Sequence, residues 1–353
     1  MTEHVPGAPG AAGESMSAEI AAQPEVLAAS VLRHSEIAEV ARVVSARKPR
    51  FALLAARGSS DHAATYAKYL IEVLLQLPAG LVSPSATTLY GARPDLSDVL
   101  MISVSQSGGS PDLVEVTEVA RAQGALTVAV TNTPGSPLNG VAEHAIDIGA
   151  GPELAVAATK TYTATLLSLY LLIDAVRGGT GEAVRDIGAL AASALDDTEE
   201  QVAESVQRLR FVERVLTTGR GYSSASASEA ALKLAETSYL AARAYSGADL
   251  LHGPVAAVDE ETAVLAVTSK GHGGSAMVDV VKAVRARGAD VLAVGSAAGE
   301  VGANSHLVLP DSAEEVAPIL EILPLQRIAL GLALARGGDP DNPRGLLKVT
   351  KTR

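Results

Sequence analysis

One strand-and-loop pattern occurs twice in this chain, at a nearly constant separation. Gly58 and Gly221 each follow an apolar run and open a serine-containing loop, and 163 residues separate them. Ser105 and Ser269 each close a further apolar run, and 164 residues separate them. A period this long indicates two copies of one domain, because a solenoid would repeat every roughly 20 to 50 residues. The 353 residues are enough for two domains of ordinary size.

Each copy alternates short apolar strands with helices. In the first copy we expect strands near 51–56, 81–83, 99–104, 126–131 and 145–148, and helices near 60–76, 84–90, 111–123 and 157–177. This alternation predicts an α/β fold, with each domain a doubly wound parallel sheet of the flavodoxin or Rossmann type flanked by helices. Ligands of such sheets bind at the carboxyl ends of the strands, where the strand order reverses.

Changes in composition mark the expected domain boundaries. Residues 1–18 are rich in glycine, alanine and proline, and we expect them to be disordered. A helix over 192–209 is expected to open the second copy, after a glycine-rich linker at 177–181. The expected units are a first domain with an N-terminal helix over 19–180, a second domain over 190–336 and a C-terminal tail over 337–353.

The net charge and the missing residue types exclude several classes of function. The formal net charge is −12, which argues against nucleic acid and anionic membranes as partners. The sequence has no cysteine, and therefore no disulfide, thiolate metal site or thiol nucleophile. Its histidines and carboxylates show no metal-ligand spacing, so we expect neither a metal nor another cofactor. No apolar run approaches a membrane span and residues 1–15 lack a signal-peptide pattern, so a cytoplasmic location is expected.

A serine- and glycine-rich loop lies between an expected strand and an expected helix. It contains Ser105, Gln106, Ser107 and Ser110, and the helix begins near Asp112. Backbone N–H groups, hydroxyls and the helix dipole favour an anion at such a place. The loop has no lysine and differs from a nucleotide-binding P-loop, so its neutral donors suit a monophosphate. The alternative is a structural turn with a serine N-cap.

Three charged residues share one face of another expected helix. Glu229, Lys233 and Glu236 are four and three residues apart, and their neighbours on the helix are apolar. Burial tends to raise the pKa of a carboxylate, which can then move protons near neutral pH. The alternative is a ladder of salt bridges on the surface.

Two further residues stand in unusual local sequences. His252 precedes Gly-Pro and is expected in a turn, where an imidazole can exchange protons near neutral pH. Lys348 follows two prolines that stiffen the C-terminal tail. The alternatives are an ordinary capped loop histidine and a solvated lysine in a frayed tail.

Six segments, in order along the chain, resemble the sugar-isomerase (SIS) double-domain family. This family includes the isomerase part of glutamine–fructose-6-phosphate aminotransferase, or glucosamine-6-phosphate synthase, and stand-alone glucosamine-6-phosphate deaminases of that type. The segments are Arg57-Gly-Ser-Ser60, Ser105-Gln-Ser-Gly108, Val156-Ala-Ala-Thr-Lys160, Glu229-Ala-Ala-Leu-Lys233-Leu-Ala-Glu236, Leu251-His-Gly-Pro254 and Asn342-Pro-Arg-Gly-Leu-Leu-Lys348. The resemblance implies two tandem SIS domains and covers the chain from about residue 19.

The resemblance also implies roles for individual residues. The residues that it places on the sugar phosphate are Ser59, Ser60, Ser105, Gln106, Ser107, Ser110 and, through its backbone, Val156. Glu236 would move a proton between C1 and C2, while Lys233 and Glu229 position the open-chain sugar. His252 would open the sugar ring from the neighbouring subunit of a homodimer. Lys348, in the active-site tail, would engage a ketose carbonyl as a Schiff base.

The expected reaction is the conversion of glucosamine 6-phosphate to fructose 6-phosphate and ammonia, through removal of the C2 proton from the open-chain sugar. The same intermediate permits a dehydratase that expels the C3 hydroxyl of N-acetylglucosamine 6-phosphate. A deglycase for glycated amino-acid phosphates and a plain aldose–ketose isomerase are further alternatives. Outside enzymes, the alternative is a non-catalytic sugar-phosphate sensor, against which the joint presence of Glu236, His252 and Lys348 argues.

Some features depart from the synthases of that family. The chain has no cysteine and not the length for a glutaminase domain, so we expect it to be unable to draw ammonia from glutamine by itself. Ser110 replaces a threonine of the family, and Arg57 replaces a small residue or cysteine of the synthases. Arg57, the stretch 156–160 and the tail look more like the stand-alone deaminases.

Overall fold

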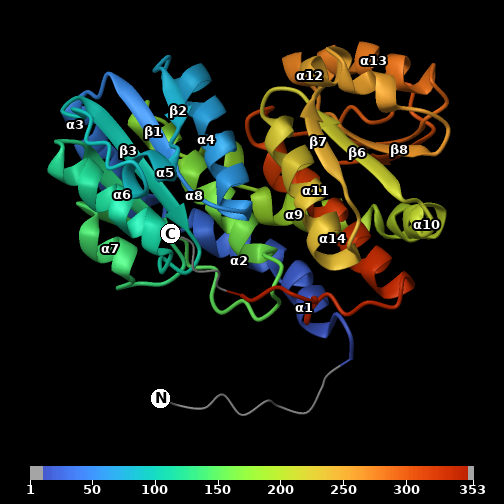
Figure 1. Ribbon diagram of the computed structural model, residues 1–353, viewed down its shortest axis with the longest axis horizontal. Helices are drawn as coiled ribbons and strands as arrows, with labels where there is room; N and C mark the ends of the chain where they lie inside the picture. Colours follow the sequence, from blue (N-terminus) through green and yellow to red (C-terminus); the bar gives the residue numbers. More distant parts are fainter. Residues whose placement is uncertain (1–10, 349–353) are drawn as a thin grey trace.

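The computed structural model describes residues 11–348, which form two α/β lobes side by side (Figure 1). Each lobe contains a five-stranded sheet with parallel pairings throughout. The strand order is β2-β1-β3-β4-β5 in the first lobe and β10-β9-β8-β6-β7 in the second. Counted from its other edge, the second sheet has the order of the first with each number raised by five. The two lobes are therefore copies of one fold, as the sequence repeat predicted.

The first lobe confirms the strands and helices expected from the sequence to within three residues. Its strands are β1 (Phe51–Ala55), β2 (Ala79–Leu81), β3 (Val99–Ser105), β4 (Leu126–Thr131) and β5 (His144–Asp147). Its helices are α3 (His34–Arg47), α4 (Ser59–Leu74), α5 (Pro84–Thr88), α6 (Pro111–Ala122), α7 (Pro137–Val141) and α8 (Lys160–Val176). The strand order reverses between β1 and β3, so a ligand site is expected there.

The second lobe repeats this arrangement. Its strands are β6 (Arg214–Gly219), β7 (Arg243–Ser246), β8 (Thr262–Val267), β9 (Asp290–Gly295) and β10 (Ser305–Val308). Its helices are α10 (Glu199–Leu209), α11 (Ser223–Ser238), α12 (Gly247–Leu251), α13 (His272–Arg285) and α14 (Ala317–Ala335). Short 3-10 turns at Glu182–Val184 and Pro254–Ala257 complete the connections.

The single helix expected over 192–209 is wrong, because the chain forms two helices there. They are α9 (Ile187–Asp196) and α10, with the break at Asp197 and Thr198. The Thr198 hydroxyl donates to the carbonyl of Ala194 at 2.7 Å, and Asp197 accepts from Ser193. The Thr198 hydroxyl thus takes a carbonyl that the backbone ladder would otherwise use, which favours a break in the helix at this point.

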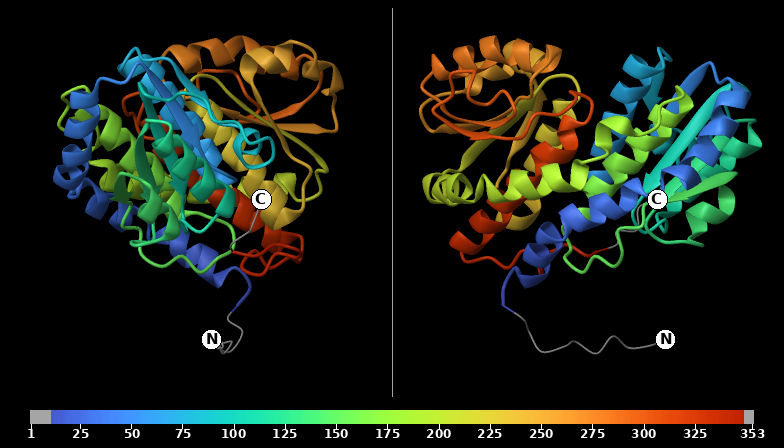
Figure 2. Two further views of the ribbon diagram at one scale, coloured as in Figure 1. Left: turned by 60° about the vertical axis from the view of Figure 1, so that its left-hand side comes forward. Right: turned by 180° about the vertical axis from the view of Figure 1, so that it is seen from behind.

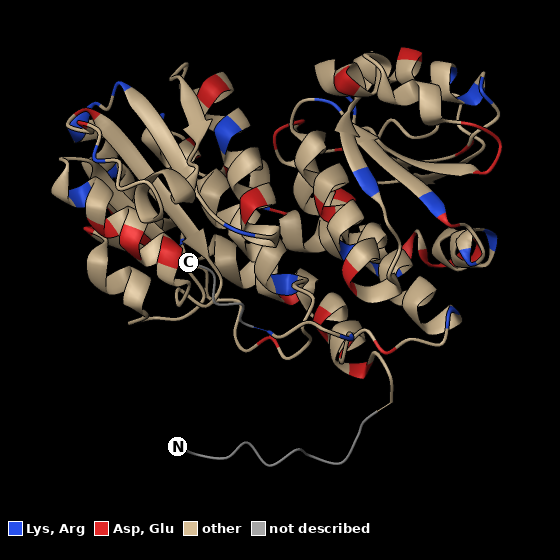
Figure 3. Ribbon diagram, in the orientation of Figure 1, with Lys and Arg blue, Asp and Glu red and all other residues tan. Residues whose placement is uncertain are grey.

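One continuous apolar core joins the inner faces of the two sheets. In β3, Leu100, Ile102 and Val104 belong to this core, while Met101 points into a separate cluster under α6. Helices α8, α11 and α14 pass between the sheets, and α8 and α11 each pack on α14 (Figures 1 and 2). Strands β1, β3 and β4 contain no charged residue. In the view of Figure 3, acidic and basic residues alternate along the surrounding helices and loops.

The N-terminal helices pack against this core. Helix α1 covers Glu14–Ala21 and α2 covers Gln23–Val31, so the expected disorder of residues 1–18 is wrong for 14–18. Residues 1–10 of that expectation lie outside the described residues. Helix α1 is held because the backbone N–H groups of Ser15 and Met16 donate to the carboxylate of Asp341, at 2.8 and 2.9 Å.

Helix α14 is the one helix within residues 11–348 that is long and apolar enough to cross a membrane. Of its most apolar 18-residue stretch, 83% is buried inside the protein. It packs against α10 and α11, so it serves as a core helix of the second lobe.

Candidate functional site

A cavity of about 340 Å³ lies at the carboxyl ends of β1 and β3, where the first sheet reverses its strand order. The predicted site residues that line it are Ser59, Ser60, Ser105, Gln106, Ser107, Ser110, Val156, Glu236 and Lys348. The predicted residues Glu229 and Lys233 lie directly behind Ser59 and Glu236. The structure therefore brings together segments from both lobes and from the C-terminal tail.

The serine loop after β3 is held in a fixed shape. The Ser105 hydroxyl accepts from the N–H of Gly108 at 3.1 Å, and the Ser107 hydroxyl accepts from the N–H of Gly109 at 3.3 Å. Gly108 has a φ of 61°, and a Cβ there would come within 2.0 Å of the Ser136 Oγ. Only glycine fits this position without strain, so the loop shape is encoded locally.

Two helix N-termini open onto the cavity. Ser59 and Ser60 begin α4, and Ser110 is the N-cap of α6. Each helix N-terminus carries partial positive charge and favours an anion. Arg57 lines the cavity and pairs through its Nε with the buried carboxylate of Asp112 at 2.8 Å, which leaves its other N–H groups available to an anion. This end of the cavity is therefore suited to a small anion such as a phosphate group.

The charged face of α11 is buried behind this anion end. Glu229 and Lys233 are each 0% exposed, which excludes a surface ladder for these two residues. The Lys233 ammonium lies 3.4 Å from Glu229 and pairs with Glu236. Glu229 also accepts from the Ser59 hydroxyl and contacts the Nδ1 of His62, both at 2.8 Å. Glu236 remains partly exposed and reaches the cavity.

The ionisation of this cluster differs from the sequence expectation. Burial alone would raise the pKa of Glu229, but the charge of Lys233 and the hydrogen bonds with His62 and Ser59 outweigh burial and hold the pKa below its usual value. Burial alone would lower the pKa of Lys233, but Glu229 and Glu236 raise it above the ordinary lysine value. The expected rise in carboxylate pKa is therefore wrong for Glu229, which stays ionised as part of a buried charge network.

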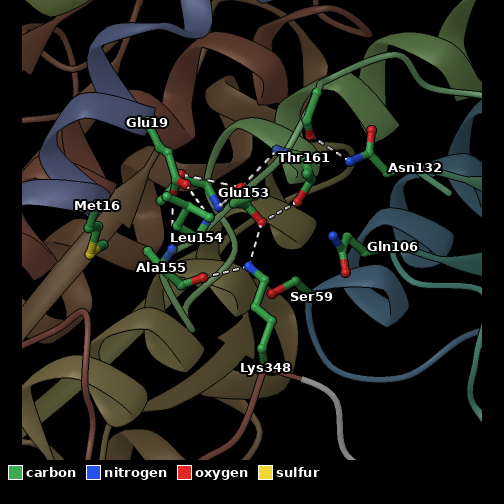
Figure 4. A network of polar contacts seen from close by, with 12 residues as sticks. Met16, Glu19, Ser59, Gln106, Asn132, Glu153, Leu154, Ala155, Thr161 and Lys348 are labelled. Carbon is green, nitrogen blue, oxygen red and sulfur yellow. Dashed lines mark hydrogen bonds and ion pairs between the residues drawn. The ribbon is translucent and has the colours of Figure 1, made fainter. Parts of the chain in front are cut away.

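The C-terminal tail brings Lys348 to the cavity, and Figure 4 shows its side chain pointing toward Glu153 and Ala155. Its Nζ donates to the carboxylate of Glu153 at 2.9 Å and to the carbonyl of Ala155. The Glu153 side chain is 0% exposed and also accepts from Thr159 and Thr161. Burial tends to raise the pKa of Glu153, but Lys348 and these hydrogen bonds lower it below the usual value.

His252 lies apart from the cavity of its own chain. It is exposed at the end of α12, in the second lobe, and it does not line the cavity. The structure of the single chain thus gathers the other predicted residues and leaves His252 on the surface.

The corresponding loops of the second lobe are filled by the protein's own carboxyl groups. Ser223 and Ser269 donate to Glu321 at 2.7 and 2.6 Å, and burial raises the pKa of that carboxyl. The first N–H groups of α13, from His272 and Gly273, donate to Glu314 at 2.9 and 2.7 Å. The second lobe therefore satisfies internally the donors that the first lobe turns toward its cavity.

Sequence reasoning missed three residues of the site: Asp112, His62 and Glu153. Asp112 and His62 act through partners that are 55 and 167 residues away, so local patterns give no signal for them. The sequence does indicate Glu153, because it is the lone charged residue of the otherwise uncharged stretch 148–159. Within residues 11–348, no three His, Asp or Glu side chains are gathered closely enough to hold a metal ion.

Comparison with known proteins places the chain in a family. The SIS-domain profile matches residues 47–175 and 208–336. Glutamine–fructose-6-phosphate aminotransferase [isomerizing] of Pyrobaculum aerophilum is 35% identical over 345 residues, which are 95% of this chain. The chain spans 57% of the length of that relative.

Solved structures share the whole two-lobed architecture. A crystal structure from Silicibacter pomeroyi DSS-3, named as a candidate phosphosugar isomerase, is 37% identical with a TM-score of 0.82, covering 93% of this chain and 99% of that chain. The glucosamine-6-phosphate deaminase of Thermotoga maritima has the same fold, with a TM-score of 0.79 at 23% identity, covering 96% of this chain and 100% of that chain. Each matched profile segment contains one of the two sheets. The chain belongs to the SIS-domain family and carries one SIS domain in each lobe.

Proposed function

We propose that this chain is an amino-sugar-phosphate enzyme that converts glucosamine 6-phosphate to fructose 6-phosphate and ammonia. The observation that carries the proposal is that an anion-binding loop, the carboxylate of Glu236 and the amine of Lys348 line one cavity. The curated relative is named for chemistry on fructose 6-phosphate, and a structural neighbour is named a glucosamine-6-phosphate deaminase. A phosphate at the serine loop would leave the carbon chain of the sugar facing Glu236 and Lys348.

The phosphate is held by neutral donors and by helix N-termini. Ser60, Ser107 and Ser110 offer hydroxyls beside the first turns of α4 and α6. Arg57, held by its pair with Asp112, offers further N–H donors at the same end of the cavity. Such a site binds a monophosphate without activating it for transfer, because the group needs only to be held.

Glu236 is the proposed acid and base. In the open-chain amino aldose it removes the C2 proton, which leaves an enaminol with negative charge developing on O1. Returning that proton to C1, while one proton passes from the amine nitrogen to O1, gives a 2-imino sugar with a C1 hydroxyl. One water molecule then hydrolyses the C=N bond, and the products are fructose 6-phosphate and ammonia.

Lys233 and Glu229 hold Glu236 in place for this transfer. The Lys233 ammonium pairs with Glu236 and lies 3.2 Å from the Ser59 hydroxyl. Because Lys233 is fully buried, its position is fixed by Glu229 and Ser59 behind it. A carboxylate oriented in this way costs less reorganisation in the transition state.

Ring opening is assigned to His252 of a second copy of the chain. In one chain His252 is exposed at the end of α12 and does not line the cavity, so it can act only on the cavity of a neighbour. The proposed assembly is a homodimer in which each subunit lends its α12 turn to the other.

The test offers purified protein glucosamine 6-phosphate and, separately, N-acetylglucosamine 6-phosphate. Ammonia and fructose 6-phosphate in equal amounts from the free amine support the proposal. An ultraviolet-absorbing product from the acetylated sugar would replace it with the dehydratase. Binding of both sugars without turnover of either would replace it with the non-catalytic sensor.

A further inference from the structure

His62 is a histidine that the proposed reaction does not use, although it contacts the buried charge network behind the cavity. It lies in the first turn of α4, and its Nδ1 is 2.8 Å from one carboxylate oxygen of Glu229. The Ser59 hydroxyl, three residues earlier on the same helix, donates to the other oxygen at 2.8 Å. Helix α4 thus holds both oxygens of Glu229 where it packs against α11, between the two lobes (Figure 1).

This contact determines where the imidazole can gain a charge. The pKa of Glu229 is held low, so Glu229 is ionised and can only accept a hydrogen bond, and Nδ1 must donate one. The other ring nitrogen, Nε2, is therefore the atom that gains or loses a proton. The side chain of His62 is 22% exposed and that of Glu229 is 0% exposed, so solvent reaches the network at the histidine. Imidazole is the side-chain group that commonly changes charge between about pH 5 and 8.

A chain of ionic contacts joins His62 to the acid and base of the proposed reaction. The Lys233 ammonium lies 3.4 Å from Glu229 and also pairs with Glu236. Lys233 and Glu229 are fully buried, so charges act on one another there more strongly than in water. Two carboxylates therefore share one buried cation, and a second cation beside Glu229 would leave more of that shared charge to Glu236.

The net charge of the network determines how readily Glu236 takes up a proton. With Lys233 protonated and both carboxylates ionised, the network has one negative charge in excess while His62 is neutral, and none once His62 is protonated. Proton transfer to Glu236 brings the first state to neutrality, whereas it leaves the second with an excess positive charge in a buried place. Glu236 is therefore the stronger base while His62 is neutral.

The other groups near His62 and Glu229 are few. Asp61 precedes His62 on α4, and burial raises its pKa while the charges of His62 and Arg57 lower it. Tyr162 of α8 lies near Glu229, and burial raises the pKa of its phenol well above the ordinary value, so it stays uncharged. Strands β1, β2 and β3, which also pack on α4, contain no charged residue. His62 is thus the imidazole through which pH can act on this network.

We propose that His62 is a positioning residue for Glu236 and acts on it through the buried charge network. While His62 is neutral, Glu236 removes the C2 proton of the sugar, and protonation of His62 suppresses this removal. His62 exchanges its proton with solvent and forms no bond to the sugar. This role rests on the proposed function, because it assigns the proton transfer to Glu236.

The first measurement needs no substrate. Nitrogen NMR of protein labelled with ¹⁵N-histidine, assigned through backbone connectivities, follows the titration of His62 between pH 5.5 and 8.5. Coupling between two protonation sites is reciprocal, so Glu236→Gln, which removes one negative charge, should move the midpoint of His62 to lower pH by about 0.3 pH units or more. His306 is the internal standard, because it is exposed on β10 of the second lobe and its midpoint should not move.

The second measurement is the pH profile of kcat. An asparagine at position 62 places an uncharged N–H donor where Nδ1 lies, so His62→Asn keeps a donor for Glu229 but cannot gain a charge. From pH 8.5 to pH 6, kcat should fall at least fivefold in the native protein and less than twofold in His62→Asn, with little difference in KM. The titration of the substrate itself is common to both proteins and cancels in this comparison. His306→Gln is the matched control and should keep the native profile.

Either measurement can overturn the proposal. The native pH profile retained in folded His62→Asn would exclude the coupling, as would a His62 midpoint that does not move in Glu236→Gln. A His62 that keeps one charge state from pH 5.5 to 8.5 would also exclude it. If His62→Asn does not fold, the titration in Glu236→Gln decides, because that side chain is partly exposed and pairs only at the edge of the network. If the midpoint moves but neither amino sugar reacts, the coupling stands and the proposed reaction fails.

Discussion

The hydroxyl of Ser59 donates a 2.8 Å hydrogen bond to the carboxylate of Glu229, although 170 residues separate the two. Ser59 opens α4 in the first lobe, whereas Glu229 lies on α11 in the second. The ammonium of Lys233 donates to the same hydroxyl at 3.2 Å. One serine therefore ties a buried charge network of the second lobe to the cavity of the first.

Replacing this serine tests the tie between the lobes. Ser59→Ala leaves Glu229 and Lys233 without one hydrogen-bond partner in a buried site, so we expect the free energy of unfolding to fall by about 1–3 kcal/mol. Urea denaturation followed by circular dichroism measures the change. Ser60→Ala is the matched control, because its hydroxyl lines the cavity and forms no hydrogen bond to the described residues. Equal stability of the two variants would contradict the structural role of Ser59.

Glu236→Gln tests the assignment of the acid and base. The amide keeps the shape of the side chain but cannot take up a proton, so kcat should fall by about 10²–10⁴-fold. Binding of fructose 6-phosphate, measured by calorimetry, should persist because the serine loop and Arg57 are unchanged. Turnover that matches the native protein would remove Glu236 from the reaction.

Glu321→Gln tests the buried carboxyl of the second lobe through pH. Burial raises the pKa of Glu321 in the folded state above its unfolded value of 4.5, while Ser269, Ser223 and Ser226 donate to it. As the pH rises, the unfolded chain releases this proton at a lower pH than the folded protein does. The protonated carboxyl therefore stabilises the folded protein at low pH, and this stabilisation is lost as the pH rises above about 4.5. The variant should therefore gain stability relative to the native protein as the pH rises from 4 to 7. A difference that stays constant over this range would show that Glu321 does not titrate as described.

Gly108→Ala tests the shape of the serine loop. The new Cβ would lie within 2.0 Å of the Ser136 Oγ, at a φ of 61° that alanine rarely adopts. We expect the Kd for fructose 6-phosphate to rise at least tenfold. Backbone strain should also lower the free energy of unfolding by about 1–3 kcal/mol. Gly109→Ala is the control, because the nearest atom to its Cβ is the Ser107 Oγ at 3.7 Å. Equal affinities of the two variants would mean that the loop adapts freely.

Features that depend on neighbouring residues were predictable from the sequence. The repeat and the alternation of strands and helices gave the parallel sheets, because apolar periodicity is a local property of the chain. Ser105 could be placed at the cavity for the same reason, since it ends a buried strand at the point where the sheet reverses its order. The position of Lys233 on one helix face with Glu236 followed from helical spacing alone.

Features that depend on distant partners were not predictable. Helix α1 has the composition of a disordered segment, yet Asp341 holds it from 325 residues away. Glu229 was expected to have a raised pKa, but Lys233 on the same helix, helped by contacts with His62 and Ser59 from the other lobe, lowers it. Neither His62 nor Asp341 carries a local signal for the contact that it makes.

The glutamates that occupy the second lobe give the duplication an asymmetric outcome. Glu314 already caps α13, and Glu321 already accepts from Ser269. A ligand that bound to the second lobe would therefore have to displace a carboxyl group of the protein itself. Binding stoichiometry should therefore be one sugar phosphate per polypeptide, in spite of the twofold ancestry of the scaffold. The second lobe instead contributes α11 to the site in the first lobe. A calorimetric titration that reached two equivalents would show that a ligand can displace these two carboxyl groups.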